Sequence, residues 1–471
     1  MKKLFCLLCA CALLLSLAGC AGGGSGPAEP SAEPDTPSQS AVDSAAAATV
    51  QEITPMYPEM MPYPDEADYR NADGELDQAY YEAIDKWWQS SMALHDQPEG
   101  YADGLEPFFT DSIRQVLSDA GDANRVYSPL NVYMALGMVA EITDGESRDQ
   151  VLALLGSEDI DALRTQANAI WNANYLDDGA SVSILASSLW LNDAINFKQD
   201  TLQSLADNYY AASCWGTMGS DAMNQALRDW VNVQTGGLLQ DQTEGLSLDP
   251  DTILALATTV YFRAKWTEEF DEDRTAPDTF HAASGDMTCD FMHQDSDSLY
   301  YWGDSFSAVG MYMESGHTMW LLLPNEGVSP EALLQDDQFM EFLLSNKYDW
   351  PNNKYYTVHL SVPKFDVASD LDLIPSLQAL GVTDVFDYTT SDFTPLTDDV
   401  DEIYVSQAEH AARVAIDEHG CTATAVTVIM GMGAGGPEGE VDFTVDRPFL
   451  FAITGPEDLP MFVGVVNTPT L

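Results

Sequence analysis

Basic residues are scarce in this chain of 471 residues: 18 Lys and Arg stand against 76 Asp and Glu, which gives a formal net charge of −58. A nucleic-acid partner is excluded, because its phosphates require a basic surface. The same repulsion disfavours anionic polysaccharides and acidic lipid surfaces. The charge predicts a well-solvated surface that would attract a cationic partner at low salt. Hydrophobic residues make up 45% of the chain, which is enough for a large core.

Motifs of common catalytic and metal sites are missing. The chain contains no GxSxG, HExxH or Walker sequence, and its 7 His are scattered singly, so we expect no enzyme activity, no metal and no cofactor. One literal match to GxGxxG occurs at Gly431, Gly433 and Gly436. Residues 437–440 follow it with two acids and no helix start, where a dinucleotide would bring its phosphates. We therefore reject a nucleotide site.

Cysteine is sparse beyond the first twenty residues. Only Cys214, Cys289 and Cys421 remain there, an odd number at wide spacing. Such a set predicts no disulfide framework.

The first 19 residues have the order of a secretory signal peptide, with two Lys, a short apolar run and small residues. The run from 4 to 17 is too short for a comfortable transmembrane helix. Leu17-Ala18-Gly19-Cys20 resembles the lipobox of bacterial lipoproteins. This resemblance implies that Cys20 is lipidated, that the lipid anchor is the only membrane contact, and that the exported protein is at the cell surface or extracellular. An ordinary signal peptide with a chance Cys is the alternative.

The mature chain divides into a tether and one large domain. Residues 21–56 contain no Leu, Phe, Tyr or Trp, and we assign residues 20–100 to a flexible, acidic, Pro/Ala/Ser-rich tether that begins at the anchored Cys20. Helical spacing from Tyr80 to Trp88 predicts one short helix within it. Residues 101–471 form the domain. Periodicity predicts helices at 105–117 and 131–142 and strands at 182–191, 309–323, 356–362 and 449–466, the last of them broken by Gly455-Pro456. This order favours an α+β fold with mostly antiparallel sheets.

Several motifs occur in a characteristic order along this domain. They are Tyr127-Ser128-Pro129, Trp230-Val231 with Thr235 and Gly237, Tyr261-Phe262 with Trp266, Pro363-Lys364-Phe365, Arg447-Pro448-Phe449 and Phe462-Val463-Gly464. Together they resemble the serpins, the serine protease inhibitors. The resemblance implies about nine helices around three sheets and an exposed reactive-centre loop. It also implies a monomer that traps serine proteases covalently.

The resemblance assigns roles to particular residues. Ser128, Pro129 and His410 match the family's shutter, and Trp266 matches the breach, where the loop starts to insert into the main sheet. Asn131 and Thr258 depart from the usual shutter residues. The hinge comprises Glu418, Gly420, Cys421, Thr422, Ala423, Thr424, Ala425, Val426 and Thr427.

The hinge residues suit insertion as a strand. Alternate side chains of a strand face one side of its sheet. Cys421, Ala423, Ala425 and Thr427 are small and uncharged, so they can enter a core, whereas the intervening residues are β-branched. In the intact protein we expect Cys421 near the exposed hinge.

The family's usual spacing from the hinge acid places the scissile bond between Ala434 and Gly435, with Met430 and Met432 as alternatives. No Lys or Arg lies nearby, so we expect elastase-like or subtilisin-like targets rather than trypsin-like ones. The alternative function is a non-inhibitory, serpin-fold binding protein on the cell surface.

Overall fold

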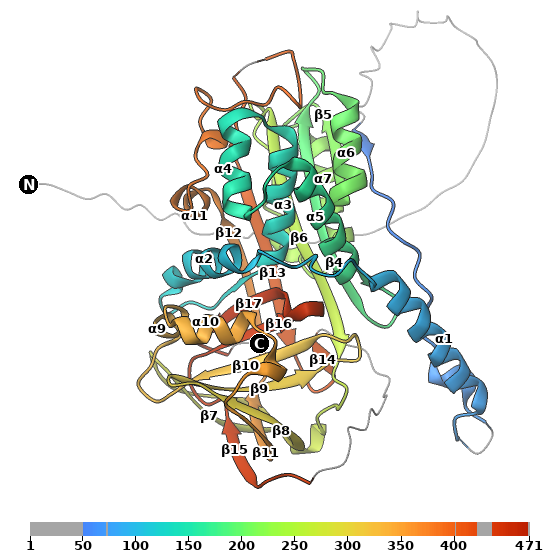
Figure 1. Cartoon of the computed structure of the whole chain (residues 1–471), viewed down its shortest axis with the longest axis vertical. Coiled ribbons are helices and arrows are strands. Elements are labelled where there is room, and N and C mark those ends of the chain that lie inside the picture. The colour runs from blue at the N-terminus through green and yellow to red at the C-terminus, as the bar shows by residue number, and fades with distance from the viewer. Residues whose placement is uncertain (1–49, 72–73, 401, 422–435, 470–471) are drawn as a thin grey trace, which may run out of the picture. The chain divides into compact units, whose positions relative to one another are not determined.

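Helices concentrate in the first half of the chain and strands in the second, as the sequence predicts (Figure 1). The structure, a computed structural model, describes residues 50–71, 74–400, 402–421 and 436–469. The α-helices in these ranges are α1 (Gln78–His95), α2 (Glu106–Leu117), α3 (Pro129–Ile142), α4 (Gly145–Leu155), α5 (Ile160–Asn174), α6 (Gln199–Tyr209), α7 (Asp221–Gln234), α8 (Gln240–Thr243), α9 (Pro330–Leu334), α10 (Asp337–Leu344) and α11 (Ile374–Ala379).

The strands of the same ranges are β1 (Gln51–Ile53), β2 (Arg125–Tyr127), β3 (Leu176–Asp177), β4 (Val182–Asn192), β5 (Ala211–Gly216), β6 (Leu254–Lys265), β7 (Ala276–Ala282), β8 (Gly285–Trp302), β9 (Phe306–Tyr312), β10 (Thr318–Pro324), β11 (Asn353–Pro363), β12 (Phe365–Asp372), β13 (Ala408–Ile416), β14 (Gly420–Cys421), β15 (Glu440–Thr444), β16 (Phe449–Thr454) and β17 (Pro460–Val466). Six short 3₁₀ helices join them: η1 (Glu66–Tyr69), η2 (Ser118–Ala120), η3 (Glu272–Arg274), η4 (Lys347–Asp349), η5 (Asp384–Phe386) and η6 (Pro456–Asp458).

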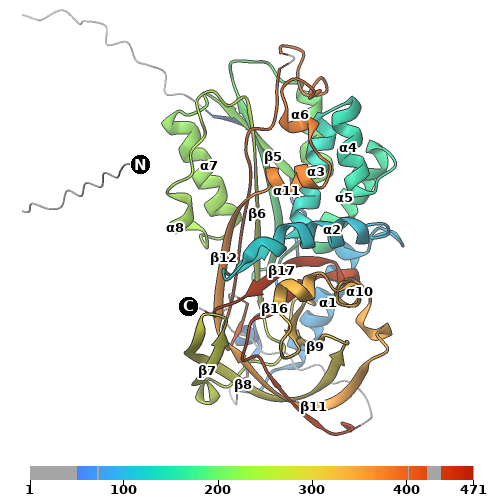
Figure 2. The same ribbon diagram turned by 90° about the vertical axis from the view of Figure 1, so that its left-hand side faces the viewer.

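The main sheet has the strand order β1-β5-β4-β6-β14-β13-β12, with β3 paired to β4. Figure 2 shows α7 and α8 on one face of this sheet and α3, α4 and α5 on the other. The two faces bury separate apolar clusters. Trp190 and Ala255 pack with Met223 and Leu227 of α7, whereas the large core lies on the opposite face. The sheet is therefore covered on both sides.

The second sheet has nine strands in the order β15-β11-β8-β9-β10-β16-β17-β2, with β7 paired to β8. The three expected sheets thus form two hydrogen-bonded networks in the described chain. Strand β8 explains the difference, because its 18 residues pair with β7 and β11 and then, at Tyr300–Trp302, with β9. Most strand pairs are antiparallel, as expected; β4–β5, β6–β13 and β11–β15 are parallel.

One predicted strand is a hairpin. The continuous strand expected at 309–323 is β9 and β10, joined by a turn in which the N–H of Met313 donates to the carbonyl of His317 at 2.9 Å. Gly316 in this turn has a φ of 81°, a conformation that glycine adopts at little cost. Glu314-Ser315-Gly316-His317 interrupts the apolar alternation, so the sequence does carry a turn signal here and the prediction of one continuous strand is wrong.

The segment assigned to the tether is structured from Val50 onward. Strand β1 extends the edge of the main sheet by pairing antiparallel with β5. The Tyr57 ring then lies 5.0 Å from that of Trp171 and 5.5 Å from that of Tyr175, measured between centroids. The helix expected at 80–88 is present within α1. The predicted boundary between tether and domain at residue 100 therefore differs from the observed one, because residues 50–100 belong to the same compact unit as the domain.

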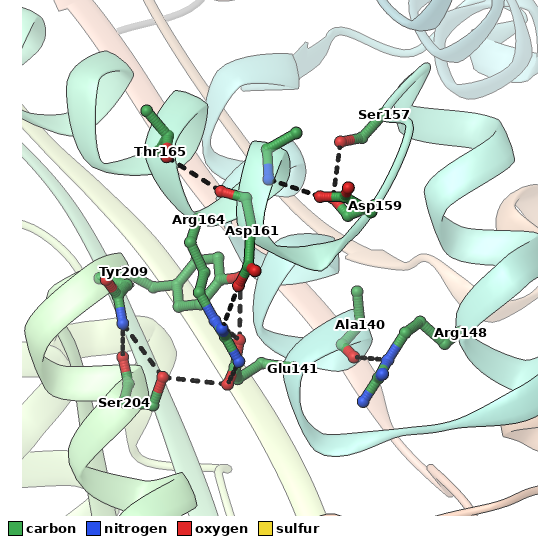
Figure 3. Close-up of polar contacts among 12 residues, drawn as sticks. Ala140, Glu141, Arg148, Ser157, Asp159, Asp161, Arg164, Thr165, Ser204 and Tyr209 are labelled. Atoms are coloured by element: carbon green, nitrogen blue, oxygen red, sulfur yellow. Dashed lines mark hydrogen bonds and ion pairs between the residues drawn. The ribbon is translucent and has the colours of Figure 1, made fainter.

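Helix α3 is buried along its whole length, and its single charged residue organises its neighbours. The guanidinium of Arg164 on α5 donates to both oxygens of Glu141, each at 2.7 Å (Figure 3). The hydroxyl of Ser204 donates to the same carboxylate at 2.9 Å, and that of Tyr209 at 3.3 Å. The network joins α3, α5 and α6, and it satisfies a charge that would otherwise be costly to bury.

Candidate functional site

The central strands of the main sheet open into a fork. Ala408–Ala411 of β13 pair parallel with Leu256–Thr259 of β6. Further along, β14 lies between the two strands: Cys421 pairs with Ile416 of β13 and with Ala264 of β6. Between these levels, in the described chain, no strand pairing joins residues 260–263 to residues 412–415. The fork is therefore open over four residues on each side, and β14 occupies its mouth.

A tight turn precedes β14. The Asp417 N–H donates to the carbonyl of Gly420 at 3.0 Å, and the Asp417 carboxylate accepts from the N–H groups of His419 and Gly420. Trp266, which follows β6 and is buried, fastens this turn to β6. Its indole N–H donates to the carbonyl of Asp417 at 2.9 Å, and its backbone N–H donates to that of His419 at 3.1 Å. The predicted breach residue thus fixes the position at which the loop leaves the sheet.

The hinge acid Glu418 is buried and paired. Its Oε2 lies 2.7 Å from Nζ of Lys364, and the hydroxyl of Thr275 donates to its Oε1 at 2.7 Å. Burial alone would raise the pKa of Glu418, but the hydrogen bonds from Lys364 and Thr275 outweigh burial and hold the pKa below its ordinary value. Glu418 is therefore a carboxylate at neutral pH, held between β12's start and η3's end.

Cys421 differs from its expected position. It is 1% exposed and belongs to the large apolar core, whereas the sequence placed it near the exposed hinge. The reason is that β14 already pairs with both neighbouring strands. Directly opposite residues of paired strands face the same side, and Ile416 is also buried in the core. Cys421 therefore faces inward, as its alternating set predicts.

His410 lies at the closed end of the fork and is fully buried. Its Nε2 accepts the N–H of Ser128 at 3.1 Å, and its Nδ1 lies 3.3 Å from the hydroxyl of Thr258. Because Nε2 is an acceptor, Nδ1 carries the proton and donates to Thr258. Burial lowers the pKa of His410 to about 4, so the ring is neutral at pH 7.

The two shutter departures behave differently. Thr258 on β6 contacts His410 on β13, and so links the two strands below the four open levels, where only an insertion deeper than residue 425 would have to separate them. The side-chain amide of Asn131 is buried with no hydrogen-bond partner in the described chain. Ser128 Oγ instead accepts the Asn131 N–H at 3.4 Å as the cap of α3, directly before Pro129.

The remaining predicted positions lie outside the described residues. They are Cys20, Thr422, Ala423, Thr424, Ala425, Val426, Thr427, Met430, Met432, Ala434 and Gly435. In the described part of the chain, no helix has both the length and the apolar character needed to cross a bilayer. No group of three or more potential metal ligands gathers among those residues either.

Comparisons with known proteins decide the family. The model of the family described as serpin (serine protease inhibitor) matches residues 104–469. The chain belongs to the serpin family. Serpins are generally protease inhibitors rather than enzymes, and serine proteases are their partners.

Relatives and solved structures agree with this assignment. Serpin-ZX of Arabidopsis thaliana is 27% identical over 368 residues, which cover 74% of this chain and 93% of that protein. Serpin-Z2B of Triticum aestivum is 26% identical, with 74% and 90% covered. The thermophilic serpin tengpin in its native state has a TM-score of 0.69 at 25% identity and covers 79% of this chain and 95% of its own. Human thyroxine-binding globulin, at 20% identity, a TM-score of 0.67 and coverage of 79% and 100%, shows the shared serpin fold.

Two partners of the hinge acid are not predictable from the sequence. Lys364, part of the Pro363-Lys364-Phe365 motif, is the counter-ion of Glu418. Thr275 is the second partner of that carboxylate. Both lie far from Glu418 in sequence and carry no local pattern that marks their role.

Proposed function

We propose that this serpin is a suicide-type inhibitor of serine proteases that acts by loop cleavage, covalent trapping of the acyl-enzyme and insertion of the loop into the main sheet. The open fork is the observation that carries this proposal. Strand β14 runs antiparallel to β13 and β6, so each residue after Cys421 would move one level deeper, from Ile416 and Ala264 toward the closed end. Residues 422–425 would fill the four open levels.

Deeper insertion would have to separate β6 from β13. At the level of His410, the pairing with Thr258 and the contact between their side chains would break. This arrangement supports an energy barrier to insertion. Residues 422–425 would enter the open fork, whereas the residues after them would have to displace the pairing between β6 and β13. A loop that is still tethered at both ends has little slack to cross that barrier, whereas cleavage frees one end.

The inward-facing positions match the loop's composition. The same count places residues 423, 425 and 427 level with Val414, Ala412 and His410, which are all buried. The loop has Ala, Ala and Thr at these three positions, so insertion would bury no charge.

We further propose cleavage between Ala434 and Gly435, or after Met430 or Met432, by an elastase-like or subtilisin-like protease. The absence of Lys and Arg from residues 428–436 supports this preference. The net charge of −58 supports faster encounter with cationic proteases at low salt.

The test compares two substitutions that introduce a positive charge at neighbouring loop positions. Ala423→Arg would place a cation in the core, whereas Thr424→Arg would place it on the opposite side of the inserted strand. Each variant is incubated with pancreatic elastase and run on denaturing gels. We expect the parent chain and Thr424→Arg to form a covalent band larger than the protease, and Ala423→Arg to be cleaved without trapping. Clean cleavage of the parent chain by elastase and subtilisin would instead favour a non-inhibitory binding protein.

We also propose that the protein is an exported bacterial lipoprotein, anchored through Cys20 at the cell surface or released outside the cell. The lipobox-like sequence supports this location. Radiolabelled palmitate should enter the full chain expressed in a lipoprotein-processing bacterium and should not enter Cys20→Ser. Equal labelling of both would contradict the anchor.

A further inference from the structure

His419, one residue before β14, lies between two carboxylates of another segment. Its Nδ1 is 3.2 Å from Oε2 of Glu269, and its Nε2 is 3.1 Å from Oε1 of Glu272. A carboxylate can only accept hydrogen bonds, and a neutral imidazole has one donor nitrogen and one acceptor. Both contacts are therefore favourable only when the ring is the doubly protonated imidazolium. This geometry selects the charged form.

Glu269 has few other options. Its second oxygen, Oε1, is buried and has no hydrogen-bond partner in the described chain. The carboxylate side chain is 25% exposed, so its interaction with His419 is only partly screened. If a neutral ring donated from Nε2 to Glu272, the lone pair on Nδ1 would face the carboxylate of Glu269, and the two would repel each other.

The clamp joins the two parts that define the fork. His419 belongs to the turn that leads into Gly420 and Cys421, and both of its backbone polar groups are bonded there, to Asp417 and Trp266. Glu269 and Glu272 belong to the segment that continues from β6. The protonated ring therefore attaches the turn at 417–420, which leads into β14, to the β6 side of the fork.

The carboxylates around His419 act in the same direction, and the nearby cations oppose them. Asp417 contributes a further negative charge from the turn itself, while Arg274 of η3 is paired with Asp295 and Lys364 is paired with Glu418. Lys265 at the end of β6 faces Glu314 and Glu269. The hydrogen bond to Glu269 raises the pKa of His419 above its ordinary value, and the charges of Glu269 and Asp417 add to this rise.

We propose that His419 is a proton-controlled clamp: its imidazolium holds the turn at 417–420 against residues 269–272 and keeps Gly420 and Cys421 seated between β6 and β13. Because the folded form binds the proton more tightly, the clamp's contribution is complete below the unfolded pKa and is lost as pH rises through the folded pKa. Each unit of pKa difference corresponds to about a tenfold change in the seating equilibrium. The consequence for inhibition rests on the proposed function. Above the pKa of His419 in the folded protein, the turn at 417–420 loosens, insertion of the loop slows, and more inhibitor is cleaved without trapping.

The seating of Gly420 and Cys421 between β6 and β13 can be tested without a protease. Hydrogen exchange of the intact full chain gives protection factors for the amides of Gly420 and Cys421, each corrected for the intrinsic rate at the same pH from 5.5 to 8.5. We expect protection to fall as pH rises, with a midpoint that matches the NMR titration of the His419 ring. His419→Gln should show low, pH-independent protection. His281→Gln is the matched control, because His281 also pairs with a carboxylate, that of Asp286, but lies on the β7–β8 hairpin; it should retain the parent profile.

A second variant separates the clamp from a general loss of stability. Glu269→Gln with Glu272→Gln keeps the side-chain lengths and removes both charges, so the His419 midpoint should move to lower pH and the loss of protection should move with it. Protection that stays constant with pH in the parent chain, or that is unchanged in His419→Gln, would overturn the clamp. Trapping assays at pH 6 and pH 8 then give the ratio of cleaved to trapped inhibitor, which should rise with pH. Absence of trapping at both pH values would contradict the proposed function and leave the exchange result standing.

Discussion

Replacing Lys364 by Met removes the cation beside Glu418 while keeping an unbranched side chain. The carboxylate would remain 6% exposed, with Thr275 as its remaining side-chain donor. Breaking a buried ion pair by removing one partner typically costs 3–5 kcal/mol. Lys364 itself is 22% exposed and Thr275 still donates, so we expect the lower end, about 3 kcal/mol, at pH 7. The loss should appear in the midpoint of urea unfolding followed by circular dichroism.

The pH dependence of this loss tests its cause. In the parent chain the pKa of Glu418 is held below its ordinary value, so the pair stabilises the fold above the unfolded pKa and the stabilisation is lost as pH falls through the folded value. In Lys364→Met, burial is less opposed and should raise the pKa of Glu418, so the carboxyl protonates in mild acid. The difference between variant and parent should therefore shrink from pH 7 to pH 4.5.

Adding Glu418→Gln to Lys364→Met supplies the control. The amide has nearly the shape of the carboxylate and can still accept from Thr275, but it carries no charge. The double variant should recover much of the loss at pH 7. A loss of the same size at both pH values, or a double variant as unstable as Lys364→Met, would show that lost packing rather than an unpaired charge is responsible.

Three further predictions use the same unfolding measurement. Glu141→Ala leaves the hydroxyl groups of Ser204 and Tyr209 without their acceptor, while Arg164 keeps its pair with Asp161, and should cost about 2 kcal/mol; an unchanged midpoint would show that the network is not needed for stability. Tyr57→Ala removes a ring from the cluster around Trp171 and should cost about 3 kcal/mol if the N-terminal segment stabilises the body. Because Cys421 is already buried, Cys421→Arg should destabilise the intact chain before any cleavage while Cys421→Ser should not; equal midpoints would contradict the seating of β14.

Local pattern was sufficient for most elements. Helix α2 and strand β11 follow from hydrophobic periodicity, because each presents one face to the core. Helix α3 and strands β4, β16 and β17 are buried nearly throughout and follow from their apolar content. The turn between β9 and β10 is marked in the sequence by Ser315-Gly316, a turn signal that the prediction of one continuous strand did not use. The structured start of the chain also escaped, since β1 acquires its role only through pairing with the distant β5.

The site divides in the same way. Motif order predicted roles for Trp266 and His410, which lie at the two ends of the fork, and alternation assigned the inward side of Cys421. The predicted hinge residues 422–427 lie outside the described residues. The pairing of Gly420 and Cys421 with β6 and β13 in the intact protein could not be predicted, because it depends on how far β6 and β13 separate. The pairing of Glu418 with Lys364, and of His419 with Glu269, joins residues distant in sequence, and one sequence carries no signal for such contacts.

The melting temperature of loop-cleaved protein, compared with that of the intact chain, shows whether the loop inserts into the main sheet. Elastase is used to cut the loop, the cut is located by mass spectrometry, and both forms are heated under identical conditions. If the loop fills the open fork and replaces the pairing between β6 and β13 with two strand pairings, the cleaved form should melt at a markedly higher temperature. Cleaved and intact protein that melt together would contradict insertion, and with it the proposed inhibitory mechanism.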